Sequence, residues 1–206
     1  MSSTVDALAD SLRERILAGE LAPGTPLREE ALSSEYDVAR HSLRSALRTL
    51  QGEGIVQIET NRGARVKSLS PEDVRGLSDL RLALEVEAAR MALERGDGRL
   101  PPGVHAALDT LVAVCRRSRP SWGAVAEAHE ALHHEIVLAA QSDRLANVHR
   151  QAGAELRLFV LQLPATWTLE RIATDHVKLV RRLEADGADA LRPHIEESTR
   201  ALLEEA

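Results

Sequence analysis

Aromatic residues are nearly absent from this chain of 206 residues, which has two Trp, one Tyr and one Phe. Its core must be built from Leu, Val, Ile and Ala, which favours packed helices because strands prefer aromatic and β-branched residues. A single cysteine, Cys115, excludes an internal disulfide and makes a reducing cytoplasm the expected compartment. No apolar run approaches the roughly 18 residues of a membrane span, and no signal segment is apparent. These absences favour a mainly helical cytoplasmic protein without a membrane partner.

Positive charge is in the minority but is concentrated in one segment. The chain has 26 Lys and Arg against 32 Asp and Glu, a formal net charge of −6. Residues 40–67 reverse this balance, because six basic groups stand there against only Glu53 and Glu59. A basic stretch on an acidic protein indicates contact with a phosphate backbone.

The order of elements in residues 1–69 predicts a winged helix-turn-helix. Apolar residues at helical spacing predict three helices, and two alternating segments joined by Asn61-Arg62-Gly63 predict a β-hairpin. The predicted helices and strands cover residues 5–18, 28–36, 39–51, 55–59 and 64–67.

Residues 70–206 predict a separate all-α bundle of about six helices. The segment Ser70-Pro71-Glu72-Asp73 is typical of a helix start, with Ser as N-cap, Pro at the first position and acids in the first turn. The periodicity stays helical beyond it, and no segment predicts a strand. We therefore place the boundary between a DNA-binding domain and an effector-binding and dimerisation domain at residues 69 and 70.

The third predicted helix has the pattern of a DNA-recognition helix. Arg40, Arg44 and Arg48 are four residues apart and form one stripe, while Leu43 and Leu47 form an apolar stripe. An arginine-bearing face suits the major groove, where Arg bonds two acceptors of guanine at once. On the hairpin, Arg62 is placed to reach phosphates or the minor groove.

Histidines gather in the second part of the chain. His129 and His133 are four residues apart on one predicted helix face, and His176 and His194 lie on two later helices. Neutral imidazoles from three helices converging inside a bundle predict a site for a divalent transition metal such as Zn²⁺ or Ni²⁺. By contrast, we expect His105 and His149 to be partly exposed helical residues, and His134 to point toward the surface.

The same helix also contains the pattern of a zinc peptidase. His129-Glu130-Ala131-Leu132-His133 matches H-E-x-x-H, in which two His bind zinc and Glu acts as general base. Such an enzyme also needs a third ligand and a strand to hold its peptide. A zinc metallopeptidase is therefore kept as the alternative function.

The first 67 residues resemble the GntR family of transcription regulators. The resemblance lies in spaced motifs in the family's order, namely Leu12–Leu21, Pro23-Gly24, Val38-Ala39-Arg40, Glu53–Val56 and Asn61–Gly63. It implies that Arg40 and Arg44 contact bases or phosphates, with His41 and Ser42 near the DNA backbone and Gly63 at the wing. The chain departs from the family at Glu30, where an Arg is common, and this departure implies an altered operator preference.

Residues 74–203 resemble the FCD ligand-binding domain of the FadR subfamily. The resemblance lies in four segments, namely Arg81–Glu85, Leu132–Leu145, the helix from Asp175-His176 to Leu183, and His194-Ile195. Many members hold a divalent metal through an Asp and three His, which implies His133, His176 and His194 as ligands and puts His129 at the Asp position. Histidine there makes the ligand set softer and favours Zn²⁺ or Ni²⁺. The spacing from His176 to His194 is about one helical turn shorter than expected, which leaves the direction of His194 open.

The FCD resemblance also implies an effector with a carboxylate or a hydroxy acid, bound near the metal. Arg81 is the first candidate to pair with that carboxylate, and Arg157 is a second of the same kind. Alternatively, Arg81 forms a surface ion pair with Glu85 one turn along its helix. The sequence thus predicts a regulator and not an enzyme: a homodimeric repressor that binds double-stranded operator DNA with palindromic symmetry and responds to a small molecule.

Overall fold

The computed structural model describes residues 4–163 and 167–204. The chain divides into two compact units, residues 1–68 and 69–206. Each unit has its own hydrophobic core, so each is described by itself.

From residue 4 onward, the first unit contains three helices and a small antiparallel sheet with the strand order β1-β3-β2. Its elements are α1 (Thr4–Leu17), β1 (Pro26–Leu27), α2 (Glu29–Glu35), α3 (Arg40–Gly52), β2 (Val56–Glu59) and β3 (Gly63–Val66). Strands β2 and β3 form the predicted hairpin, with Ile58 opposite Ala64. Asn61 and Gly63 in the turn have φ angles of 65° and 77°, a region that Asn and Gly adopt more readily than other residues.

The core of the first unit follows from the apolar stripes of its helices. Leu12 and Ile16 of α1 are fully buried, as are Leu43 and Leu50 of α3, and these two helices pack against each other. Arg13 of α1 donates two hydrogen bonds to the Glu53 carboxylate directly after α3. The apolar face of α3 is thereby held inside, which leaves its arginine face outward.

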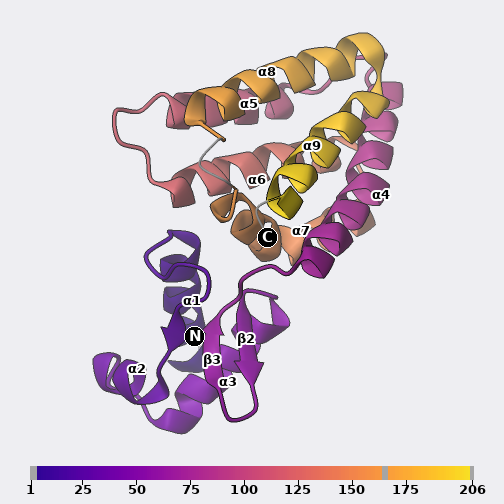
Figure 1. The fold of residues 1–206 in the computed structure, drawn as a ribbon. Helices are drawn as coiled ribbons and strands as arrows, with labels where there is room; N and C mark the ends of the chain where they lie inside the picture. Colours follow the sequence, from indigo (N-terminus) through magenta and orange to yellow (C-terminus); the bar gives the residue numbers. More distant parts are fainter. Residues whose placement is uncertain (1–3, 164–166, 205–206) are drawn as a thin grey trace. The chain divides into compact units, whose positions relative to one another are not determined.

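The second unit is a bundle of α-helices with one short 3₁₀ turn (Figure 1). Its elements are α4 (Pro71–Arg95), α5 (Pro102–Cys115), α6 (Trp122–Ala139), α7 (Asp143–Leu161), α8 (Leu169–Asp186), η1 (Ala188–Ala190) and α9 (Leu191–Glu204). The predicted start of α4 is confirmed, since Ser70 and Asp73 form a capping box with Pro71 in the first turn.

Helix α6 occupies the middle of this bundle, because it packs against α4, α5 and α7. Leu132 and Ile136 of α6 are fully buried in the main core, together with Leu111 of α5 and Ile172 of α8. Side chains on α6 therefore face the interior from more than one side of the helix. Among the described residues, no helix is long and apolar enough to cross a membrane.

The predicted fold class is confirmed: a winged helix-turn-helix is followed by an all-α bundle. Strand β1 was not predicted, because it is only two residues long and is defined by its pairing with β3. So short a segment has no alternation of its own to reveal it.

Candidate DNA-recognition helix and histidine site

The outward face of α3 carries the predicted arginine stripe. Arg40, Arg44 and Arg48 are exposed, while Leu43 and Leu47 on the opposite side are buried. The α3 helix begins after Ala39, whose side chain makes no capping hydrogen bond. The arginine face is therefore available to a ligand. The start of α3 lacks the side-chain hydrogen bond that usually caps a helix.

Acidic side chains of α2 contact two of these arginines. Arg44 Nε lies 2.8 Å from a Glu29 carboxylate oxygen, and an Arg40 guanidinium nitrogen lies 3.5 Å from Glu30. Glu30 is the residue at which the sequence departs from the GntR pattern. These contacts are exposed to solvent, so they orient the arginines without neutralising them in a buried pair.

The remaining predicted DNA contacts lie at the start of α3 and on the hairpin. His41 is exposed and Ser42 is half-buried in the first turn of α3. Arg62 is exposed beside Glu59, with 3.3 Å between their charged atoms, and Gly63 opens β3. A Cβ at Gly63 would meet no atom within 4 Å, so it is the positive φ that favours glycine there.

In the second unit the four predicted metal ligands lie together. His129 and His133 come from α6, His176 from α8 and His194 from α9, and one ring nitrogen of each lies within 4.8 Å of the others. His133 and His176 are buried, and His194 is half-buried. The sequence left the direction of His194 open. In the structure its ring points toward the other three and stacks on His133, with centroids 5.4 Å apart.

The hydrogen bonds of two of these rings indicate which ring nitrogen carries the proton. His133 Nδ1 lies 2.7 Å from a Glu85 carboxylate oxygen, and His176 Nδ1 lies 2.7 Å from the Ile172 carbonyl oxygen. Both acceptors require a proton on Nδ1, which leaves a lone pair on each Nε2. These two Nε2 atoms lie 3.4 Å apart, and Arg81 Nη2 also lies 3.4 Å from His133 Nε2.

Burial keeps the imidazoles in the form that binds metals. Desolvation, with the neighbouring His133 adding to it, lowers the pKa of His176 to about 3. The same burial holds the pKa values of His129 and His194 well below the ordinary value. Neutral rings with Nδ1 held by an acceptor and Nε2 converging are the arrangement of metal-binding histidines.

Arg81 is engaged in a buried ion pair. Its Nε lies 2.7 Å from the Glu85 carboxylate, and the two side chains are 4% and 1% exposed. The alternative pairing predicted from the sequence is therefore present, but in the interior and not on the surface. Burial alone would raise the pKa of Glu85, but the Arg81 charge and the contact with His133 hold it well below its usual value. Arg81 and Glu85 both contact the His133 ring and thus hold it in place.

Arg157, the second effector candidate, differs from Arg81. Its Nε is buried and has no hydrogen-bond partner among the described residues. An unpaired buried N–H is costly unless a ligand satisfies it. The Nε–H group of Arg157 therefore remains available to a ligand, whereas the Nε–H group of Arg81 is bonded to Glu85.

Cavities border the histidine group. One of about 10 Å³ has room for no more than a water molecule and lies between Arg81, Glu85, His129, Glu130, His133, Leu156 and Phe159. Another, of about 320 Å³, opens to solvent beside His194 and has the size of a small-molecule site. It is lined by Asp175, Lys178, Leu179, Arg182, Ala190, Pro193, His194 and Glu197. Sequence reasoning missed Lys178 and Arg182, which look like ordinary exposed helix residues.

The predictions for the remaining histidines had mixed outcomes. His105 is partly exposed on α5, as expected. His149 was predicted to be partly exposed, which is wrong: only 2% of it is accessible, because α7 packs this face against α6. His134 is half-buried and contacts His149.

Comparison with known families separates the regulator from the peptidase. Residues 4–66 match the model for bacterial regulatory proteins of the gntR family, and residues 76–201 match the FCD domain. These are families of regulators and not of enzymes, and among the described residues of the second unit there is no strand to hold a peptide. The peptidase alternative is not supported.

Curated relatives are transcription regulators. The chain is 39% identical over 95 residues to the uncharacterized regulator BphR of Paraburkholderia xenovorans, covering 46% of this chain and 39% of that protein. It is 40% identical over 81 residues to the repressor RspR of Escherichia coli, covering 39% and 36%. It is 37% identical over 84 residues to the gluconate operon repressor of Bacillus licheniformis, covering 41% and 34%. Each match spans less than half the length of the relative.

A solved structure extends the likeness over the whole chain. A putative GntR regulator from Rhodococcus superimposes with a TM-score of 0.80 at 24% sequence identity, covering 100% of both chains. That likeness shows the fold, and the two matched family models supply the membership. The chain belongs to the GntR family of bacterial regulatory proteins, in the FadR-like subfamily whose second domain is an FCD domain.

Proposed function

We propose that this protein is a ligand-responsive repressor that binds a palindromic DNA operator as a homodimer. Two copies of α3 must enter successive major grooves, so the distance between them sets the affinity for an inverted repeat. The exposed arginine stripe of α3 supports this role. The named relatives RspR and the gluconate operon protein are repressors, which supports the direction of regulation.

We propose that the residues predicted from the sequence make the DNA contacts. Arginines of α3 read base edges and phosphates, the start of α3 lies along the backbone, and the hairpin reaches an adjacent groove. The residues concerned are Arg40, His41, Ser42, Arg44, Arg48, Arg62 and Gly63.

We further propose that the four histidines hold a divalent transition metal, Zn²⁺ or Ni²⁺. The observation that carries this proposal is the convergence of one ring nitrogen from each of the four histidines within 4.8 Å. An ion placed among these nitrogens would be bound by several of them at once. His129 and His194 supply the other nitrogen ligands, and a bound ion would add a Lewis acid that attracts a carboxylate oxygen.

The proposed effector is a small carboxylic or hydroxy acid. The solvent-open cavity beside His194 supports its entry from that side, where Lys178 and Arg182 lie among the acids Asp175 and Glu197. Arg157 offers an unpaired donor, whereas Arg81 holds Glu85 and acts in our proposal by orienting His133.

Helix α4 connects this site to the DNA-binding unit along the chain. It begins at Pro71, shortly after the first unit ends at Ser68, and carries Arg81 and Glu85 into the histidine site. An effector that binds one arrangement of these helices more tightly increases the fraction of molecules in that arrangement. The affinity for DNA changes as a result.

The proposal is tested by DNA binding with a promoter fragment from the protein's own gene. We expect specific binding that weakens steeply with salt, because phosphate contacts release counterions. Arg44→Ala should cost about 1–3 kcal/mol of specific binding free energy, measured by fluorescence anisotropy. The exposed Arg90 of the second unit, changed to Ala, is the matched control. Equal operator affinity for Arg44→Ala and the wild type would contradict the assignment of α3.

A further inference from the structure

A second group of potential metal ligands lies on the neighbouring face of α6. Four-residue spacing pairs Glu130 with His134, just as it pairs His129 with His133, and the two pairs are turned by about 100° around the helix axis. His149 of α7 meets the second pair because α7 packs on α6. The repeated spacing therefore gives α6 two ligand faces.

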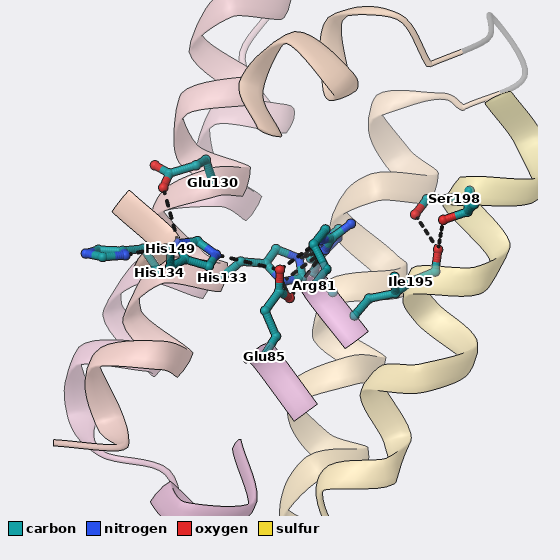
Figure 2. Close-up of polar contacts among 10 residues, drawn as sticks. Arg81, Glu85, Glu130, His133, His134, His149, Ile195 and Ser198 are labelled. Carbon is teal, nitrogen blue, oxygen red and sulfur yellow. Dashed lines mark hydrogen bonds and ion pairs between the residues drawn. The ribbon is translucent and has the colours of Figure 1, made fainter. Parts of the chain in front are cut away.

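The three side chains of this second group converge. One ligand atom each of Glu130, His134 and His149 lies within 4.8 Å of the others. The Nδ1 atoms of His134 and His149 are 3.1 Å apart, and a Glu130 carboxylate oxygen lies 3.8 Å from His149 Nδ1. Figure 2 shows these residues on one side of the Glu85 carboxylate and Arg81 on the other.

The environment of His149 fixes the nitrogen that would bind an ion. His149 is 2% exposed, and its Nε2 has no hydrogen-bond partner among the described residues. The acceptor facing Nε2 is a Glu85 carboxylate oxygen at 3.6 Å. If the proton is on Nε2, on the side of this carboxylate, the Nδ1 lone pair is left facing His134 and Glu130, which is the order of groups in a carboxylate–histidine–metal triad.

Gly153 makes space for the carboxylate of this group. It lies one helical turn after His149 on α7, and a Cβ there would stand 3.2 Å from a Glu130 oxygen. Glycine inside a helix costs about 1 kcal/mol relative to alanine, so its presence needs a compensating reason. The close approach of Glu130 provides one.

We propose that Glu130, His134 and His149 form a second divalent-metal site, separate from the four-histidine site. Two imidazoles and one carboxylate are a ligand set that suits Zn²⁺ and leaves a fourth position for water. Glu130 and His134 are only partly buried, which gives an ion access from solvent. Glu85 contacts a histidine of each group, so occupation of one site acts on the other through this carboxylate.

Zinc stoichiometry of the full chain tests the second site. The chain is stripped with chelator, loaded with Zn²⁺, desalted and analysed for zinc per chain, with affinity measured against a competing chromophoric chelator. We expect two zinc ions in the wild type and one in His134→Gln. Glu130→Gln should weaken the second ion about tenfold or more. His105→Gln, which removes an exposed histidine paired with Glu184, is the matched control and should keep both ions.

The outcomes separate the two sites. The double variant His129→Gln, His133→Gln should lose one ion and keep the one bound by His134. If the four-histidine site binds no metal, the wild type holds one ion that His134→Gln removes and the double variant retains. His134→Gln and Glu130→Gln with the zinc content and affinity of the wild type, and with unchanged circular dichroism, would overturn the second site.

Discussion

Replacing Glu85 by Gln removes a buried charge while changing the shape of the side chain very little. Glu85 lies 2.7 Å from both Arg81 Nε and His133 Nδ1, and neither Glu85 nor Arg81 is more than 4% exposed. The substitution leaves the Arg81 guanidinium charged and buried without a counter-ion. Breaking a buried pair in this way costs about 3–5 kcal/mol. Because Gln creates no cavity and still accepts a hydrogen bond, we expect the free energy of unfolding to fall by about 3 kcal/mol.

The assay is urea unfolding of the metal-free chain followed by tryptophan fluorescence. Both tryptophans, Trp122 and Trp167, lie in the second unit, so the signal reports on that unit alone. The double variant Arg81→Met, Glu85→Gln removes the uncompensated charge, and we expect it to recover at least half of the lost stability. In the same variants the metal affinity should fall about 10–100-fold, because His133 loses its carboxylate partner.

A loss below about 1 kcal/mol for Glu85→Gln would refute this reasoning, because it lies in the range of solvent-screened surface pairs. A double variant less stable than Glu85→Gln alone would also contradict it, since the packing of Arg81 would then outweigh its unpaired charge.

Three further predictions concern the cap of α3, the acid beside its arginines and the metal. Ala39→Ser should stabilise the first unit by about 1 kcal/mol, because Ala39 is an N-cap in extended geometry without a side-chain acceptor. Urea unfolding followed by circular dichroism measures this change, and an unchanged free energy of unfolding would contradict the prediction. Glu30→Gln should tighten binding to non-operator DNA, because the substitution removes a negative charge 3.5 Å from Arg40. Fluorescence anisotropy measured across a salt series tests this, and weaker binding by the variant would argue against the prediction. Chelator should lower the melting temperature of the wild type by more than that of His133→Ala, which keeps only the second site, and identical melting curves of the wild type with and without chelator would count against a folded-state metal.

The helices and the pairing of His129 with His133 could be predicted from the sequence because local spacing encodes them. His129 and His133 share a helix face by their four-residue separation, and Ser70 with Asp73 marks the start of α4. The convergence of His176 and His194 on that face depends on how α8 and α9 pack, which the family resemblance supplied for His176. For His194 the spacing argument left the direction open, and the packing of α9 brings it to the others.

The second ligand group could not be predicted in the same way. His134 was expected to point to the surface because it directly follows His133 in the sequence. The two side chains do lie on different faces of α6. That face is covered by α7, which buries His149 and brings Glu130 near it. Sequence spacing gives the angle of a side chain around its own helix, but not the identity of the helix that packs there.

We propose, as the central claim, that ligands of the histidine site, including its metal, shift the helices between arrangements that differ in affinity for DNA. The most direct measurement is the dissociation constant for the promoter fragment, determined at one salt concentration with zinc-loaded and metal-free chain, for the wild type and His133→Ala. The account predicts a difference of about fivefold or more between the loaded and metal-free wild type, and none for His133→Ala. Equal dissociation constants for the loaded and metal-free wild type would contradict it.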